Sequence, residues 1–306
     1  MDWYWILLLI IGSLVGFLLL FSLGFSIGVI AYLSHPKHYD PAFCNKVDAD
    51  KGLLNGQESL PRQPMNFTMA DDYEIHGDYI PAEHSRGLII FTHGYTWCRE
   101  GALKYVFMSR PLGFDSYIYD VRGHGRNKSA ATTMGHQEAR DLHEIIAYFR
   151  KQRGEETIIG LQGESMGAAT SLEVLKYGDK IDFIMEDSGY SSLKKELEFQ
   201  LRKFPFLRPL LPFCSLLLKL FHGYWMKDVD ALKAAKDYKG PLLILHGAAD
   251  TFVPSACADL IEENHQGYAQ KHMFDGCDHT HAAGEKNEEY TKIVREFLSS
   301  KILSKS

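Results

Sequence analysis

From residue 65 onward, short apolar runs alternate with stretches of helical periodicity. Several runs are almost continuously apolar, which is typical of strands covered on both faces. We predict strands at residues 87–92, 116–119, 157–161, 183–185, 241–245 and 271–274. We predict helices at 136–150, 166–177, 256–264 and 287–303, and an antiparallel pair at 66–69 and 74–80. This alternation predicts an α/β protein with a mostly parallel sheet and helices on both of its faces.

The N-terminal segment has a different pattern. No Asp, Glu, Lys, Arg or His lies between Asp2 and His35, and most residues there are Leu, Ile, Phe, Val or Gly. As a helix, residues 3–33 would be about 46 Å long, more than the roughly 30 Å hydrocarbon core of a bilayer. Tryptophan and tyrosine near the two ends suit the two membrane interfaces. The sequence therefore predicts a single-pass transmembrane helix.

A cleaved signal peptide is the alternative interpretation of this segment. It is disfavoured because no Lys or Arg precedes the apolar run, which is also longer than the usual core of about 7–15 residues. The nearest basic residue, Lys37, lies on the C-terminal flank and favours a cytoplasmic main domain at the cell membrane. We divide the chain into a transmembrane anchor (1–34), a polar, irregular juxtamembrane tether (35–64) and a globular domain (65–306).

Residues 190–235 interrupt the alternation of strands and helices. They separate two predicted strands by more than forty residues, whereas a plain crossover needs about a dozen. The middle of the segment is apolar and contains three prolines. A long insertion of this kind is commonly functional, so we expect a helical lid, with an ordinary pair of core helices as the alternative.

Composition narrows the possible classes of function. The 306 residues, 45% of them hydrophobic and 24% charged, are ordinary for a globular protein with one large domain. A formal net charge of −6 argues against a nucleic-acid partner. The five cysteines are scattered without C-x-x-C spacing, which argues against a disulfide scaffold and a cysteine-rich zinc module.

Residues 163–167, Gly-Glu-Ser-Met-Gly, have the pattern G-x-S-x-G. In this pattern a sharp strand-to-helix turn exposes a serine hydroxyl above a sheet. The flanking glycines are needed because side chains there would collide with the neighbouring strand and helix. The motif lies between the strand predicted at 157–161 and the helix predicted at 166–177. Ser165 is therefore the candidate nucleophile.

A serine nucleophile needs a base, and the base needs an orienting carboxylate. In this architecture the order along the chain is serine, acid, histidine. Asp250 follows the strand predicted at 241–245, and His279 follows the strand predicted at 271–274. Both lie just beyond the carboxyl ends of strands, where ligands bind in open α/β sheets. We predict a triad of Ser165, His279 and Asp250.

Other residues could fill these roles. Asp187 also follows a predicted strand and could replace Asp250, which could instead cap the helix that begins near residue 254. His281 could replace His279. A third alternative is a metal site formed by Cys277, Asp278 and the two histidines. The triad explains His279 without further assumptions, so we expect no metal.

An oxyanion hole requires two backbone N–H groups aimed at the developing negative charge. One comes from the residue after the nucleophile, which is Met166. The other comes from the loop after an earlier strand, and here His93-Gly94-Tyr95 follows the strand predicted at 87–92. Tyr95 is therefore the second candidate donor.

These motifs resemble the α/β-hydrolase superfamily, and the resemblance extends from residue 65 to about 303. Residues 120–125, Asp-Val-Arg-Gly-His-Gly, are similar to the D-x-R-G-H-G turn of monoacylglycerol-lipase-like and serine-aminopeptidase-like members. Arg126 and Asn127 depart from the usual continuation of that turn. With the anchor, the chain resembles bacterial membrane-tethered members. The resemblance implies an eight-stranded sheet, a triad of Ser165, Asp250 and His279, a lid between strands six and seven, and no cofactor.

The expected function is that of a membrane-anchored serine hydrolase. We expect it to cleave a small, partly apolar acyl ester, as a carboxylesterase or lipase does, with the bilayer as the partner of the N-terminal helix. One alternative is a serine peptidase or amidase, for which Glu186 or Glu196 could bind a free amino terminus. Another is a non-catalytic binding protein on a hydrolase fold.

Overall fold

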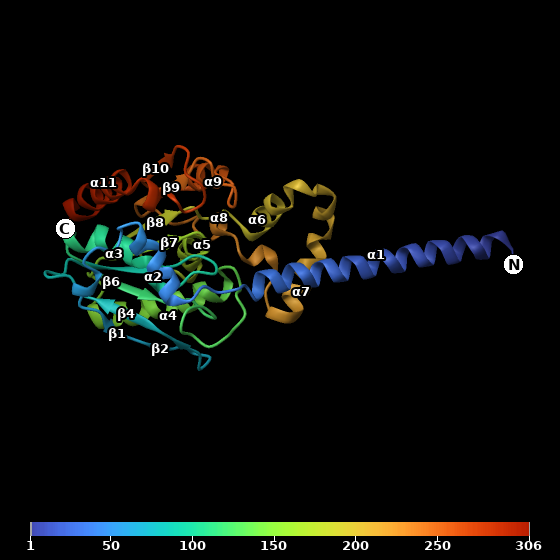
Figure 1. Ribbon diagram of the computed structural model, residues 1–306, viewed down its shortest axis with the longest axis horizontal. Helices are drawn as coiled ribbons and strands as arrows, with labels where there is room; N and C mark the ends of the chain where they lie inside the picture. The colour runs from blue at the N-terminus through green and yellow to red at the C-terminus, as the bar shows by residue number, and fades with distance from the viewer. Residues whose placement is uncertain (1, 306) are drawn as a thin grey trace.

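The computed structural model describes residues 2–305, and an eight-stranded sheet forms its centre (Figure 1). Six neighbouring strands are parallel, and two antiparallel strands, β1 and β4, complete one edge. This confirms the predicted mostly parallel, eight-stranded sheet. In spatial order the strands are β1 (Gln63–Pro64), β4 (Gly77–Ile80), β6 (Phe114–Tyr119), β5 (Gly87–Thr92), β7 (Ile159–Glu164), β8 (Phe183–Asp187), β9 (Leu242–Gly247) and β10 (Ala269–Phe274).

The antiparallel pair predicted near the start of the domain takes part in two sheets. β2 (Phe67–Thr68) pairs with β3 (Glu74–Ile75) in a small separate sheet, whereas β4 pairs with β1 and β6 in the main sheet. A single continuous strand over 74–80 was therefore a wrong prediction. His76 lies between β3 and β4, where the chain passes from one sheet to the other.

The apolar strands are buried on both faces because successive side chains point to opposite sides of the sheet. Leu88 and Ile90 of β5 join one core, whereas Ile89 and Phe91 join the other. The first core is covered by α4 (His136–Arg153), α5 (Met166–Glu173) and α9 (Ala256–Asn264), and the second by α3 (Leu103–Ser109) and α11 (Asn287–Phe297). The continuous apolar runs in the sequence follow from this two-sided burial.

The segment predicted as an irregular tether contains a helix, α2 (Pro41–Asp50), so that part of the prediction was wrong. Asp40 caps this helix by accepting a hydrogen bond from Ala42 N, and Pro41 occupies its first position. Cys44 of α2 is fully buried. Farther along, Arg62 forms ion pairs with Asp78 and Glu100 of the globular part. The segment is therefore packed against the sheet domain.

The N-terminal helix α1 (Trp3–Ser34) projects away from the domain (Figure 1). Its most apolar 18 residues have a mean hydropathy of 2.8, so it is long and apolar enough to cross a membrane. Its last turns contact the domain, where Ile30 and Leu33 are buried. A signal sequence near an N-terminus also meets these criteria of length and composition.

The insertion between β8 and β9 consists of three helices joined by 3₁₀ turns. They are α6 (Leu193–Gln200), α7 (Leu211–His222) and α8 (Ala231–Ala234). β8 and β9 are the sixth and seventh strands of the main sheet along the chain, which is the place where the resemblance puts a lid. α7 lies beside α1 (Figure 1). The lid function remains a prediction.

Candidate functional site

Ser165 lies in the sharp turn between β7 and α5, with φ 55° and ψ −116°. Positive φ is uncommon for a residue with a side chain and costs about 1–3 kcal/mol. The two flanking glycines allow the turn. A Cβ on Gly167 would overlap the carbonyl oxygen of Thr92, and one on Gly163 would overlap that of Gly167. The glycines are thus required by close backbone contacts on both sides of Ser165.

The structure brings the three predicted residues together above the carboxyl end of the sheet. Ser165 Oγ lies 2.8 Å from His279 Nε2, and His279 Nδ1 lies 2.7 Å from Asp250 Oδ2. The Asp250 side chain is fully buried, whereas the His279 side chain is partly exposed. With a hydroxyl, an imidazole and a carboxylate in this order, the imidazole can take the proton of the serine. The carboxylate can then stabilise the imidazolium that forms.

Asp250 has two structural roles at once. Its Oδ1 accepts hydrogen bonds from the backbone N–H groups of Phe252 and Val253, so it also caps the turn that follows β9. Its Oδ2 faces His279 and lies 3.1 Å from His246 Nε2. Burial acts to raise the pKa of Asp250, but the hydrogen bonds from His246 and His279 outweigh burial and hold that pKa well below its usual value. The carboxylate is therefore ionised.

The alternative residues lie elsewhere. Asp187 accepts hydrogen bonds from Tyr290 and Tyr105 in the core, and its backbone carbonyl accepts from Ser165 N. His281 lies 3.2 Å from Glu285. Asp278 accepts from Thr251 and from the backbone of His279, which joins the two loops that carry the acid and the base. Across residues 2–305 no group of three or more His, Cys, Asp and Glu side chains is arranged to hold a metal ion.

The loop after β5 passes directly beside Ser165. A Cβ on Gly94 would lie 3.3 Å from the Cβ of Ser165, and Tyr95 follows this glycine. His93 fixes the loop, since its Nδ1–H donates to Gly94 O at 2.8 Å and its Nε2 accepts from Val121 N at 2.9 Å. Burial lowers the pKa of His93, which agrees with a neutral ring in this tautomer. The two hydrogen bonds of the His93 ring therefore fix the loop that carries Tyr95.

Sequence reasoning missed a charged pair behind the nucleophile. Glu164, the residue before Ser165, forms an ion pair with buried Lys104 of α3 at 2.9 Å and accepts a hydrogen bond from Tyr105 Oη at 2.5 Å. Burial opposes ionisation of Glu164, but the Lys104 charge dominates and lowers its pKa. Nothing in the spacing along the sequence links residue 104 to residue 164, so only the fold reveals this pair. His246, four residues before Asp250, was also missed, because only the turn after β9 brings its ring to the carboxylate.

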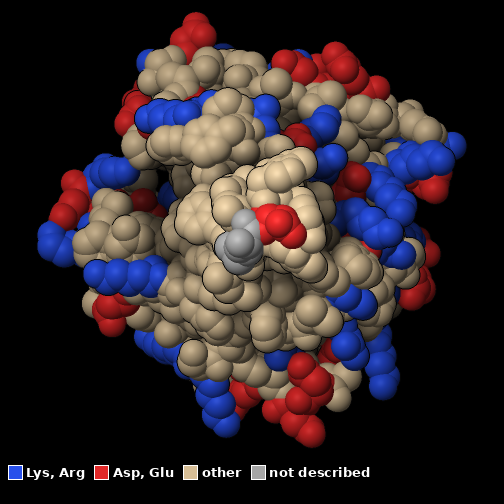
Figure 2. All heavy atoms as spheres, turned by 90° about the vertical axis from the view of Figure 1, so that its right-hand side faces the viewer, with Lys and Arg blue, Asp and Glu red and all other residues tan. Residues whose placement is uncertain are grey.

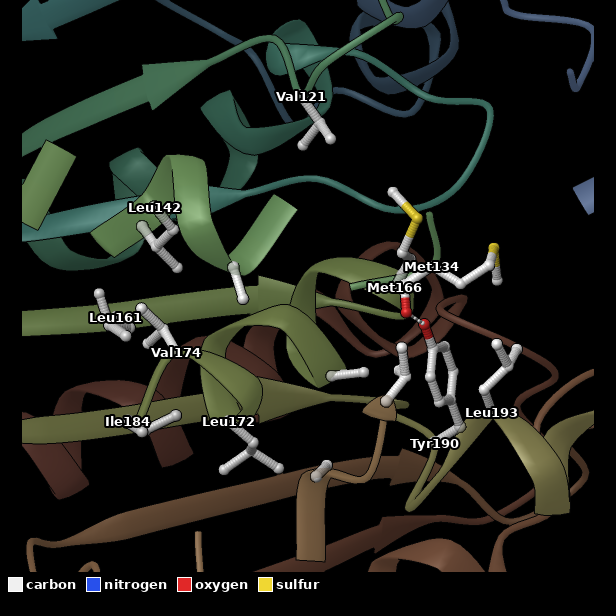
Figure 3. Close-up of a cluster of buried hydrophobic side chains, with 14 of the residues drawn as sticks. Val121, Met134, Leu142, Leu161, Met166, Leu172, Val174, Ile184, Tyr190 and Leu193 are labelled. Carbon is white, nitrogen blue, oxygen red and sulfur yellow. Dashed lines mark hydrogen bonds between the residues drawn. The ribbon is translucent and has the colours of Figure 1, made fainter. Parts of the chain in front are cut away.

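Two cavities meet at Ser165. One, of about 460 Å³, is lined mostly by apolar side chains of α1, α6 and the loops around Ser165, among them Tyr95, Met134, Met166, Tyr190, Leu197 and Phe252. Figure 3 shows Tyr190 pointing toward Met134, with its hydroxyl donating to the Met134 carbonyl at 2.7 Å. The other, of about 280 Å³, is more polar and is lined by His279, Lys51, Lys104, Asp48, Trp97 and His281, among others. A larger hollow of about 670 Å³ does not include Ser165.

Glu196 of α6 lines the apolar cavity and is buried. Its Oε1 accepts a hydrogen bond from Gln200 at 2.6 Å, while its Oε2 has no hydrogen-bond partner among the described residues. Burial raises the pKa of Glu196 to about 7, against the lowering effect of the bond from Gln200. Glu186, the other candidate for binding an amino terminus, lies outside this cavity in the core and accepts from Gly189 N.

The arrangement of strands, the turn at Ser165 and the order of the three residues define an α/β-hydrolase fold. The sequence profile of the serine aminopeptidase family S33 matches residues 83–187. That range includes the loop of Tyr95, the turn at residues 120–125 and Ser165. Over this range the chain is similar to serine-aminopeptidase-like members of the α/β-hydrolase superfamily, and it has the α/β-hydrolase fold.

Two bacterial relatives are described as uncharacterized proteins. The chain is 27% identical over 299 residues to YqkD of Bacillus subtilis, covering 96% of this chain and 97% of that protein. It is 22% identical over 210 residues to YfhR of Escherichia coli, covering 66% and 67% of the two chains.

Solved structures share the fold. An esterase of Pyrococcus furiosus, Pf2001, superimposes with a TM-score of 0.64 at 23% identity, over 81% of this chain and 94% of the esterase. An acylaminoacyl peptidase of Pyrococcus horikoshii superimposes with a TM-score of 0.59 at 18% identity, over 82% and 43% of the two chains. The fold thus accommodates both ester and peptide hydrolysis.

The raised pKa of Glu196 predicts a pH-dependent effect of Glu196→Gln on stability. The folded-state pKa of about 7 lies above the ordinary glutamate value of 4.5, so the unfolded state ionises first as the pH rises. The wild type should therefore lose stability between about pH 4.5 and pH 7, by about 3 kcal/mol, whereas glutamine has no charge to bury. In thermal denaturation of the full chain in detergent, the two midpoints should coincide near pH 4.5, and the variant should be several degrees more stable at pH 8. A difference between the two thermal midpoints that stays the same at every pH would contradict this prediction.

Proposed function

We propose that this chain is a serine hydrolase that is anchored in the cell membrane and cleaves an acyl ester with an apolar acyl group. The observation that carries the proposal is the chain of hydrogen bonds from Ser165 through His279 to Asp250, placed where an apolar and a polar cavity meet. Esterase activity of a protein with the same fold, Pf2001, is consistent with it.

The proposed chemistry is acyl transfer to water. His279 takes the proton of Ser165 as the hydroxyl oxygen attacks the ester carbonyl carbon. The N–H groups of Tyr95 and Met166 stabilise the oxyanion, and Asp250 holds the imidazole in the required tautomer. The imidazolium then protonates the departing alcohol. Water, deprotonated by His279, hydrolyses the acyl-enzyme and releases the acid.

The two cavities suggest how an ester would lie. The acyl group fits the cavity of about 460 Å³, because its walls are mostly apolar and burying hydrocarbon there is favourable. The alcohol part then points into the polar cavity of about 280 Å³, beside Lys51 and His281. An amphipathic ester satisfies both environments.

Replacing the nucleophile tests the proposal. In Ser165→Ala the site keeps its shape but has no oxygen to attack the carbonyl, so kcat for p-nitrophenyl esters should fall by at least about 10⁴-fold. The thermal midpoint should stay within a few degrees of wild type. Ser188→Ala is the matched control, because Ser188 is also buried with positive φ but hydrogen-bonds to Asp187. Turnover near the wild-type rate in Ser165→Ala would contradict the assignment.

A peptidase or amidase is the second candidate, and the unpaired Oε2 of Glu196 favours it. That oxygen lies in the cavity beside Ser165, where it could accept a hydrogen bond from a substrate amino group. The S33 family profile and the acylaminoacyl peptidase fold are consistent with this candidate.

A substrate panel separates the two candidates. We expect kcat/KM for p-nitrophenyl esters to exceed that for aminoacyl p-nitroanilides, because the cavity walls suit hydrocarbon and the described lining residues provide only one carboxyl group. Faster anilide hydrolysis that is lost in Glu196→Gln would instead establish the peptidase.

We also propose that α1 spans the membrane with the hydrolase domain on the cytoplasmic side. The support is its 32-residue apolar length and the position of Lys37 after it. A C-terminal tag should therefore resist added protease in intact cells and be digested only after lysis. Digestion of the tag in intact cells would place the domain outside, and a processed chain lacking α1 would identify a signal peptide.

A further inference from the structure

The end of α1 that meets the domain forms part of the cavity beside Ser165. Six residues of this helix line the cavity of about 460 Å³: Gly24, Phe25, Gly28, Val29, Tyr32 and Leu33. The remaining walls come from the insertion, from the loops that carry Tyr95 and Met134, and from the turn at Ser165. Membrane anchoring alone does not require a helix to line a cavity at the nucleophile, so this contact indicates a second role for α1.

This part of α1 is fixed to the domain by specific contacts. Tyr95 Oη donates to the carbonyl of Tyr32, and Thr132 N donates to Ser34 O at 2.9 Å. Ser26 is fully buried, and its Oγ lies 3.4 Å from Cys214 Sγ of α7. Because Tyr95 carries the proposed oxyanion donor, α1 also contacts the loop that would stabilise the reaction intermediate.

The uncovered part of α1 matches the thickness of a bilayer. No residue from 3 to 21 is buried, and these 19 residues rise about 28 Å, against a hydrocarbon core of about 30 Å. Burial begins at Ser22, and the cavity lining begins at Gly24. With residues 3–21 in the hydrocarbon, the cavity begins at the interfacial layer, where the ester groups of membrane lipids lie.

The surface around α1 suits contact with a membrane. Figure 2 views the molecule from the N-terminal end of α1 and shows mostly uncharged side chains around an acidic tip, with Lys and Arg as well as Asp and Glu farther out. In the insertion, Phe206, Leu220 and Phe221 are 68–72% exposed. Between residues 201 and 223 the insertion has four Lys or Arg residues and no acidic one, in a chain of net charge −6. Exposed apolar side chains among basic ones are typical of surfaces that bind anionic lipid.

The cavity follows the helix axis from the membrane end to the nucleophile. Gly24 and Tyr32 are separated by about 12 Å along α1, and Tyr32 contacts Tyr95 beside Ser165. Gly24 and Gly28 lie about one helical turn apart, and a Cβ on either would have no other atom within 4 Å. They therefore leave room in the wall that larger side chains would fill.

We propose that α1 is one wall of the acyl-binding site and that the substrate of the hydrolase is an acyl ester of a bilayer lipid, which reaches Ser165 directly from the membrane by moving along α1. This rests on the proposed hydrolase function. The acyl chain lies along Gly24 and Gly28 with its end toward the hydrocarbon, and the ester carbonyl lies at Ser165. The polar part of the lipid points into the cavity that contains Lys51 and His281.

Filling the wall tests the role of α1. The full chain is reconstituted in vesicles of phosphatidylethanolamine and phosphatidylglycerol, and kcat/KM is measured for p-nitrophenyl laurate and acetate. Gly28→Leu, with Gly24→Leu as a second variant, should lower the laurate-to-acetate ratio by at least about 10-fold, since a few methylenes in an apolar pocket discriminate by this much. Gly16→Leu is the matched control: it lies in the same helix with the same open space but outside the cavity, and its ratio should equal that of wild type.

The outcomes separate this inference from the proposed function. If wild type hydrolyses neither ester, the hydrolase proposal fails. If wild type hydrolyses both and Gly28→Leu keeps the wild-type ratio, α1 is not a wall of the acyl site, although the hydrolase proposal stands.

Release of fatty acid from the vesicle lipids themselves tests the route of access. The wild-type chain should release it, Ser165→Ala should not, and Gly28→Leu should release it more slowly. Hydrolysis of soluble laurate ester without any release of fatty acid from the vesicle lipids would overturn direct access from the bilayer.

Discussion

Ser165 has a backbone conformation that residues other than glycine rarely adopt, and the surrounding contacts hold it in that conformation. The carbonyls of Thr92 and Gly167 approach so closely that only glycine fits at positions 163 and 167. The strained turn points the serine hydroxyl out of the sheet, to within 2.8 Å of His279. Strain of this kind persists only where surrounding contacts over-determine the conformation, and here it places a nucleophile. The loops of Tyr95, Asp250 and His279 all converge on that one hydroxyl.

Buried ionised side chains pack next to this turn and next to the residues that face Ser165. Glu164 and Lys104 form an ion pair in the core, and Asp250 accepts from two histidines. Each ionised group has its partner within hydrogen-bond distance, which offsets the cost of removing charge from water. Glu196 differs, because one of its oxygens lacks a hydrogen-bond partner within residues 2–305 and its pKa is raised to about 7. That unpaired oxygen lies in the apolar cavity beside Ser165, the position where a substrate would be.

Much of the fold and of the candidate triad could be predicted from local signals. The strand at 87–92 has the predicted bounds because its apolar run is bounded by polar residues. The strand predicted at 157–161 is observed at Ile159–Glu164, since periodicity cannot show that Gln162 and Glu164 continue the buried strand. The α2 helix was missed because its sequence is polar and only its cap and Pro41 indicate it. The proximity of Lys104 to Glu164, and of α1 to the cavity, depends on tertiary packing; the glycines and serines in α1 were the available signal, since small residues mark packed faces of membrane helices.

The account depends most on Ser165 being an activated nucleophile, and covalent labelling tests this directly. The full-length protein is treated with a fluorophosphonate, and the modified residue is located by mass spectrometry of its peptides. The account predicts stoichiometric modification at Ser165 alone, which is abolished in His279→Gln while that variant keeps its thermal midpoint. Folded protein with an unmodified Ser165, or labelling that is unchanged without His279, would contradict it and would favour a binding protein on a hydrolase fold.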